Sequence, residues 1–98
     1  MARHSIWSPE AVEDIESIAA YIERDSPWYA KAVVTRLVAT AESIPEFPEL
    51  GRTVPETGHP AIRERLVYSY RLIYRVELTH ILVVAVIHGR RLLPSDLS

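Results

Sequence analysis

Apolar residues in the first half of the chain recur at the three- and four-residue spacing of amphipathic helices. Each of two such runs follows a Ser-Pro pair, which combines an N-cap residue with a proline at the first helical position. Two helices are therefore predicted to begin at Pro9 and Pro27, and the second should end near Ser43 because Pro45 restricts the residue before it. The apolar positions are Val12, Ile15, Ala19 and Ile22, with Ile18 flanking, and then Ala30, Val33, Val34, Leu37, Val38, Ala41 and Ile44.

The two predicted helices have almost no link between them, because Ser26 directly follows Asp25 at the end of the first. So short a connection favours an antiparallel helical hairpin. Its core-facing stripe is predicted to contain Val33, Leu37, Ala41 and Ile44.

Strand-like patterns surround the helical region. Residues 3–7 form a short strand candidate whose neighbour the sequence does not identify, and residues 45–60 form one long loop rich in proline and glycine. Three further strands are predicted at 62–67, 70–77 and 79–88, with a tight turn at Tyr68-Ser69, and every residue from Ile81 to Ile87 is apolar, as in a central strand. The predicted fold class is α+β, a single domain over 1–98 with the order β-α-α-β-β-β and a helical hairpin packed on one face of a small, mainly antiparallel sheet.

Arginines follow these strands at alternating positions. Alternation within each strand places Arg63 with Arg65 on one strand, and Arg71 with Arg75 on the next. If the helices cover the side that carries Leu72, Tyr74 and Val76, we expect these four arginines to converge on the open face, with Glu64 on the other side. An equally weighted alternative is that they are ordinary solvated strand positions.

Charge is divided unevenly along the chain. Residues 1–50 have four basic and nine acidic residues, whereas residues 51–98 have seven basic and four acidic ones, for a net charge of −2. The arginine-rich second half favours an anionic partner, because the guanidinium group matches carboxylate and phosphate. The negative total weighs against a sequence-independent nucleic-acid binder.

The composition also narrows the chemistry. The absence of cysteine excludes thiol catalysis and disulfides, and without a signal-peptide-like start or a membrane-length apolar run we expect a soluble, cytoplasmic protein. His88, before Gly89-Arg90-Arg91, is a candidate acid or base, although a capping or turn role is favoured. No histidine has metal-ligand spacing, and there is no glycine-rich phosphate loop or serine nucleophile motif, so neither metal nor cofactor is expected.

Four segments of the chain together resemble the RelE/ParE family of bacterial type II toxins. They are the opening WSPEAVEDIESIAAYI, the second helix after Ser-Pro, PELGRTVPE, and IRERLVYSYRLIYRV with VVAVIHGRR. Gly51-Arg52 and the closing His88-Gly89-Arg90-Arg91 are more similar to the ParE branch. The resemblance implies a toxin that a cognate antitoxin neutralises. ParE-like toxins poison DNA gyrase, whereas RelE-like toxins cut mRNA on the ribosome.

The resemblance also implies roles for individual residues. Arg63, Arg65, Arg71 and Arg90 match basic positions of the ribonuclease branch, but the aromatic residue that this branch has after its last strand has no match beyond Arg91. We therefore favour gyrase inhibition by protein binding, without catalysis, through Arg63, Arg65, Arg71, Arg75, Arg90 and Arg91. The alternatives are a ribosome-dependent endoribonuclease that uses Arg63, Arg65, Arg71, His88 and Arg90, and a degenerate member that only binds its antitoxin.

An antitoxin is the partner that the resemblance implies most directly. We expect a ribbon-helix-helix, ParD-like protein whose C-terminal segment packs along the helical hairpin and the sheet edge, giving a hetero-oligomer. The hairpin residues expected to receive it are Ile18, Trp28 and Val34.

Overall fold

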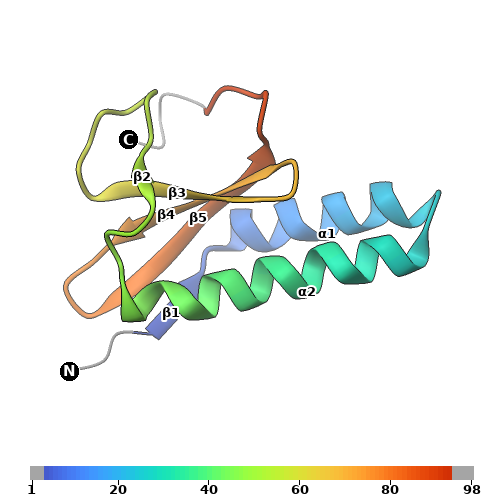
Figure 1. Cartoon of the computed structure of the whole chain (residues 1–98), viewed down its shortest axis with the longest axis horizontal. Helices are drawn as coiled ribbons and strands as arrows, with labels where there is room; N and C mark the ends of the chain where they lie inside the picture. Colours follow the sequence, from blue (N-terminus) through green and yellow to red (C-terminus); the bar gives the residue numbers. More distant parts are fainter. Residues whose placement is uncertain (1–3, 94–98) are drawn as a thin grey trace.

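The computed structural model describes residues 4–93, which form two helices packed on a five-stranded sheet, in agreement with the predicted α+β class (Figure 1). The strand order is β1-β5-β4-β3-β2, and every neighbouring pair is antiparallel except β1 with β5. The elements are β1 (His4–Trp7), α1 (Pro9–Glu23), α2 (Pro27–Ser43), a 3-10 turn (Ile44–Glu46), β2 (Arg52–Thr53), β3 (Ile62–Val67), β4 (Tyr70–Val76) and β5 (His80–His88).

Both helices begin as the Ser-Pro pairs predict. The Ser8 hydroxyl accepts a hydrogen bond from the Ala11 amide, and the Ser26 hydroxyl accepts one from the Tyr29 amide. These bonds satisfy N–H groups that the first turn of a helix leaves unpaired. The helices then run side by side along one face of the sheet (Figure 1). No helix in residues 4–93 has the length and apolar character needed to cross a membrane.

The main core lies between the helical hairpin and the sheet. The α2 stripe is confirmed, since Val33, Leu37, Ala41 and Ile44 are all at most 1% exposed. In α1, Ile22 is buried and Ile15 and Ile18 pack against the core as predicted, but Val12 is 39% exposed and the small residue Ala11 takes its place in the core. Leu72, Tyr74, Ile81, Val83 and Val86 contribute the sheet side of this core.

The first strand occupies the position that the sequence left open. It pairs in parallel with the first half of β5, where Ser5 lies opposite Ile81. Strand β5 is therefore central, between β1 and β4, which explains its continuous apolar sequence. A register irregularity between β4 and β5 at Ile73 and Tyr74 inserts Val84 as an extra residue, so Val83 and Val86 both face the helices.

A second, smaller core lies on the opposite face of the sheet. It contains Val54, Ile62, Ile73, Ala85 and Leu93. The predicted long loop is thus ordered into the 3-10 turn, the short strand β2 and a cover over this face, and the segment that ends at Leu93 packs beside it (Figure 1). The face that was expected to be open is therefore partly covered.

The buried side chain of Tyr74 on β4 is hydrogen-bonded to the loop that precedes β2. Its hydroxyl donates to the Pro48 carbonyl at 2.7 Å and accepts from the Gly51 amide at 3.2 Å. Glycine is required at position 51, because a Cβ there would overlap the Tyr74 hydroxyl and the Glu64 carbonyl. The loop backbone therefore lies directly against the sheet at Gly51.

We expect Tyr74→Phe to lower the free energy of unfolding by about 1–3 kcal/mol, because it leaves a buried amide and a carbonyl without their partner. Urea denaturation followed by circular dichroism measures this change. Tyr21→Phe, at a side chain 68% exposed, is the matched control and should change stability by less than about 0.5 kcal/mol. Equal effects of the two substitutions would mean that the Tyr74 hydroxyl does not hold the loop.

Candidate functional site

The pairing of β3 with β4 changes the predicted arrangement of the arginines. Arg63 lies opposite Tyr74, and Arg65 lies opposite Leu72. Both arginines therefore share the sheet face on which the helices pack. The expectation that four strand arginines converge on the open face is wrong.

Arg71 and Arg75 lie on the other face, opposite Leu66 and Ile62 of β3. Glu64 lies between these two β3 residues in the alternation and points to the same side. The prediction that Glu64 is separated from the arginines is therefore wrong as well, and the carboxylate lies beside Arg71.

The turn between β3 and β4 is the physical reason for both corrections. Val67 pairs with Tyr70, so the turn contains only Tyr68 and Ser69. This register places odd-numbered residues of β3 opposite even-numbered residues of β4, so the two arginine pairs fall on different faces. Tyr68 adopts a positive φ of 53°, which is uncommon for a residue with a side chain.

Arg71 forms the centre of a buried polar network and is only 5% exposed. Its Nε donates to Oε1 of Glu64 at 2.7 Å, and its Nη2 lies 2.7 Å from the same oxygen. Its two terminal nitrogens donate to the two oxygens of Glu56, each at 2.8 Å. Nη1 also donates to the backbone carbonyl of Arg91 at 2.9 Å. Each nitrogen of the guanidinium group thus has an acceptor inside the protein.

Glu64 links this buried network to the surface. Its side chain is fully buried, and its second oxygen accepts from Nε of Arg52, which lies opposite Glu64 in the β2–β3 pair. The Arg52 side chain is 63% exposed. Because a buried carboxylate is costly without compensating partners, the two arginines account for the position of Glu64.

Glu56 connects the network to the backbone of Leu93, the last described residue. One of its oxygens accepts from the Leu93 amide at 2.9 Å in addition to Arg71. The hydrogen bond from Arg71 is the main reason that the pKa of Glu56 falls from 4.5 to about 2, against the opposing effect of burial. The same hydrogen bond, with Glu64, raises the pKa of Arg71.

Two adjoining surface hollows, of about 370 and 470 Å³, lie over the network. Arg52, Arg71 and Arg90 line both of them, and Arg91 lines the first. Exposed apolar side chains border the same area, since Leu66 is 66%, Tyr68 56% and Leu92 80% exposed. We call the exposed part, Arg52, Arg90, Arg91, Leu66, Tyr68 and Leu92, the arginine surface.

The remaining predicted site arginines lie elsewhere. Arg63 donates to the carbonyls of Pro60 and Gly51, each at 3.0 Å, and so supports the loop. Arg75 is 3.9 Å from Glu77. Arg65 is half-buried on the helix side and has no ion pair within residues 4–93.

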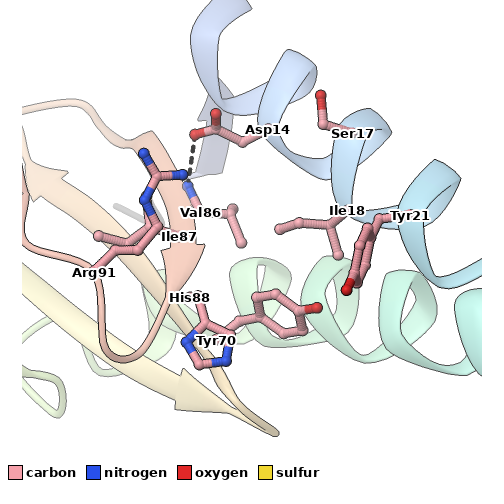
Figure 2. A pocket seen from close by; sticks show the side chains of 9 residues that line it. All are labelled: Asp14, Ser17, Ile18, Tyr21, Tyr70, Val86, Ile87, His88 and Arg91. Atoms are coloured by element: carbon pink, nitrogen blue, oxygen red, sulfur yellow. Dashed lines mark hydrogen bonds between the residues drawn. The ribbon is translucent and has the colours of Figure 1, made fainter.

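His88 lies where the helices, β4 and β5 meet. Its ring packs edge-on against Tyr70 at 5.8 Å between centroids. Its Nδ1 lies 3.2 Å from the Arg90 amide nitrogen and accepts its hydrogen bond, which stabilises the turn after β5. A hollow of about 350 Å³ beside it contains Ile18 and Tyr21 of α1 (Figure 2). The carboxylate of Asp14, at the rim of this hollow, accepts from the Val86 amide. No group of three potential metal ligands occurs in the described part of the chain.

The three hairpin residues expected to receive an antitoxin do not share one hollow. Ile18 lines the hollow beside His88, whereas Trp28 lines another, of about 540 Å³, with Lys31, Arg36 and Tyr68. Trp28 is 79% exposed, and Val34 is half-buried on α2.

Three residues of the network, Arg52, Glu56 and Glu64, were not predicted as site residues from the sequence. The two-residue turn at Tyr68-Ser69 contains the signal for Glu64, because it fixes which β3 residues face Arg71. No local pattern identifies Glu56, which reaches Arg71 across 15 residues.

The lowered pKa of Glu56 predicts acid sensitivity. The unfolded chain binds a proton at Glu56 below about pH 4.5, whereas the folded protein keeps this carboxylate charged to about pH 2. Its stabilising contribution is therefore complete above pH 4.5 and decreases as the pH falls from 4.5 to 2. We expect the stability difference between the unmodified protein and Glu56→Gln to shrink by about 1–2 kcal/mol over this range, after allowance for solvent screening.

Urea denaturation of both proteins at about pH 6 and about pH 2.5 measures this difference. Glu46→Gln removes an exposed carboxylate from the same connecting segment and should show no comparable trend. A stability difference for Glu56→Gln that stays constant over the pH range would contradict the assigned ion pair.

Comparison with known proteins agrees with the fold and the sequence resemblance. The chain is 33% identical over 88 residues to toxin RelE2 of Caulobacter vibrioides, covering 89% of this chain and 96% of that protein. A 53-residue match to putative toxin Y4kP of Sinorhizobium fredii is 38% identical, covering 53% of this chain and 55% of that protein.

Solved structures show the same fold at lower identity. The toxin-fold chain of a chromosomal ParDE system from Pseudomonas aeruginosa superposes with a TM-score of 0.72 at 18% identity, covering 89% of this chain and 96% of that one. A chain of the RelBE2 toxin–antitoxin complex from Mycobacterium tuberculosis gives a TM-score of 0.62 at 18% identity, covering 90% and 99%.

The sequence model of the ParE toxin of the type II toxin–antitoxin system parDE matches residues 5–93, which is nearly all of the described chain. The chain therefore belongs to the ParE toxin family within the RelE/ParE toxins, and it is the toxin of a type II toxin–antitoxin system.

Proposed function

We propose that this toxin inhibits growth by binding DNA gyrase rather than by cutting RNA. The observation that carries the proposal is the state of Arg71, which resembles a phosphate-binding arginine of the ribonuclease branch. Two carboxylates and a carbonyl engage its guanidinium group. Withdrawing Arg71 to meet a phosphate would remove the ion-pair partner of Glu56 and leave the fully buried Glu64 with Arg52 alone, which is unfavourable for a buried charge.

The composition of the arginine surface also supports a protein target. Arg90 and Arg91 are exposed beside Tyr68 and Leu92. Arginine and aromatic residues are enriched at protein interfaces, where apolar side chains provide buried contact and charges provide orientation. With a net charge of −2, the chain has little long-range attraction for RNA. Arg65 and Arg75, which lie away from this surface, are secondary candidates for target contact.

Purified toxin added to a gyrase supercoiling assay, and separately to translating ribosomes with a labelled mRNA, tests the proposal. We expect inhibition of supercoiling and an intact message. The double variant Arg90→Ala/Arg91→Ala should lose at least about tenfold in inhibitory potency, because it removes both exposed guanidinium groups while leaving their backbone contacts in place.

Two results would overturn this proposal. Cleaved message with untouched supercoiling would assign the protein to the ribonuclease alternative, in which His88 and Arg90 would be tested next. If neither assay responds and expression is harmless, the chain would be a member that only binds its antitoxin.

For the antitoxin, we propose docking along α2 and the free edge of β3. Strand β2 pairs only with Arg63 and Glu64, so within the described residues the edge from Arg65 to Val67 has no strand neighbour. An extended antitoxin segment can add to this edge by backbone hydrogen bonds. The adjacent hollow around Trp28, bordered by Lys31 and Arg36, fits an acidic amphipathic helix. Val34 would border the helix, and Ile18 would mark a second contact on α1.

We expect Trp28→Ala to weaken binding of the protein encoded by the adjacent reading frame by at least about tenfold, since exposed tryptophans often act as interface anchors. Isothermal titration calorimetry with the full-length toxin measures the affinity. Leu78→Ala removes a side chain 95% exposed at the β4–β5 turn and should leave the affinity unchanged. An unchanged affinity for Trp28→Ala would move the antitoxin site away from this hollow.

A further inference from the structure

We propose that Glu56, Arg71 and Glu64 are positioning residues that fix the backbone of the Arg90–Arg91 turn for its target. In this role Arg71 contacts no target itself. The importance of this positioning for the target rests on the proposed use of Arg90 and Arg91 as a contact surface. That the three residues fix the turn backbone follows from their contacts alone.

The turn is held at several points along its backbone. The Gly89 amide donates to the Ser69 carbonyl at 2.7 Å, and the Arg91 amide donates to the His88 carbonyl at 2.9 Å. The Arg91 carbonyl then accepts from Arg71 at 2.9 Å. Both the backbone amide and the backbone carbonyl of Arg91 are therefore hydrogen-bonded.

Glu56 fixes the backbone two residues further along, at Leu93. Its Oε2 accepts a hydrogen bond from the Leu93 amide at 2.9 Å, and the same oxygen also accepts from Arg71. The Leu93 side chain is 5% exposed and packs in the second core beside Val54 and Ile73. One ion pair thus links β4, the loop after β2 and the segment that follows β5.

All these contacts use backbone atoms of the turn and leave the side chains of Arg90 and Arg91 exposed. A contact surface benefits from such an arrangement, because binding then requires less ordering of mobile groups. Glu64, which is fully buried, restrains Arg71 from the other side and so sets the direction in which the guanidinium group points.

A neutral residue at position 56 distinguishes a positioning role of Glu56 from a purely electrostatic role of Arg90 and Arg91. Glu56→Gln makes the area around Arg90 and Arg91 more positive by one unit. If these arginines act only by their charge, the substitution should leave toxicity unchanged or increase it for an anionic partner. Positioning requires the opposite result, because a neutral amide cannot form the same two-oxygen ion pair with Arg71.

The test compares full-length unmodified protein, Glu56→Gln and the control Glu46→Gln. Amide hydrogen exchange by NMR measures how strongly the Leu93 amide is protected by its hydrogen bond to Glu56. The inducer concentration that stops growth measures toxicity. We expect Leu93 exchange to become at least about tenfold faster in Glu56→Gln, with about tenfold weaker growth inhibition and unchanged antitoxin affinity. The control should match the unmodified protein in all three measurements.

Unchanged exchange at Leu93 in Glu56→Gln would overturn the inference, and so would faster exchange with equal or stronger toxicity. If Glu56→Gln fails to fold by circular dichroism, Glu56→Asp takes its place under the same criteria, since it keeps the charge but shortens the reach to Arg71. Failure of the gyrase proposal is distinguishable, because growth inhibition and exchange do not depend on which target is bound.

Discussion

The ion pairs of Arg71 join parts of this toxin that the main hydrophobic core does not reach. The main core joins the helical hairpin to one face of the sheet, but the loop after β2 and the segment ending at Leu93 lie on the other face. There the apolar cluster is small, and a buried guanidinium group bridges Glu56, Glu64 and the Arg91 carbonyl. Removing one partner of a fully buried pair such as Arg71 and Glu64 costs about 3–5 kcal/mol, so the network constrains both sequence and geometry on this face.

This arrangement explains how a chain with a net negative charge presents a cationic surface. Helices α1 and α2, which contain most of the acidic residues of the first half of the chain, pack on the sheet face opposite to Arg52 and Arg71 (Figure 1). Asp14 of α1 lines a hollow that Arg91 also lines (Figure 2). Glu56 and Glu64 lie within that surface, but they are directed at Arg71 and partly at Arg52. The exposed positive charge is therefore concentrated at Arg90, Arg91 and the outer part of Arg52, where a partner can reach it.

The proposed mode of action rests on individual side chains and not on the family or the fold. RelE/ParE toxins share one fold, so the fold alone does not decide between targets. The functional distinction depends on which side chains remain free on the shared scaffold. Here Arg71 is internally engaged and the nearby exposed residues include Leu66, Tyr68 and Leu92, which is the combination on which we base the proposed contact with a protein.

The sequence by itself determined the two helices, the four longer strands and the family, because these depend on local periodicity, Ser-Pro caps and motifs. It also gave the α2 core stripe correctly. The turn at Tyr68-Ser69 was predicted correctly, but the residue-by-residue pairing of β3 with β4, which puts Arg63 and Arg65 on the face opposite to Arg71 and Arg75, was decided by the tertiary structure. The tertiary structure likewise decided the place of β1, the β2 strand and the reach of Glu56 to Arg71, since contacts between distant segments leave no periodic pattern in the chain.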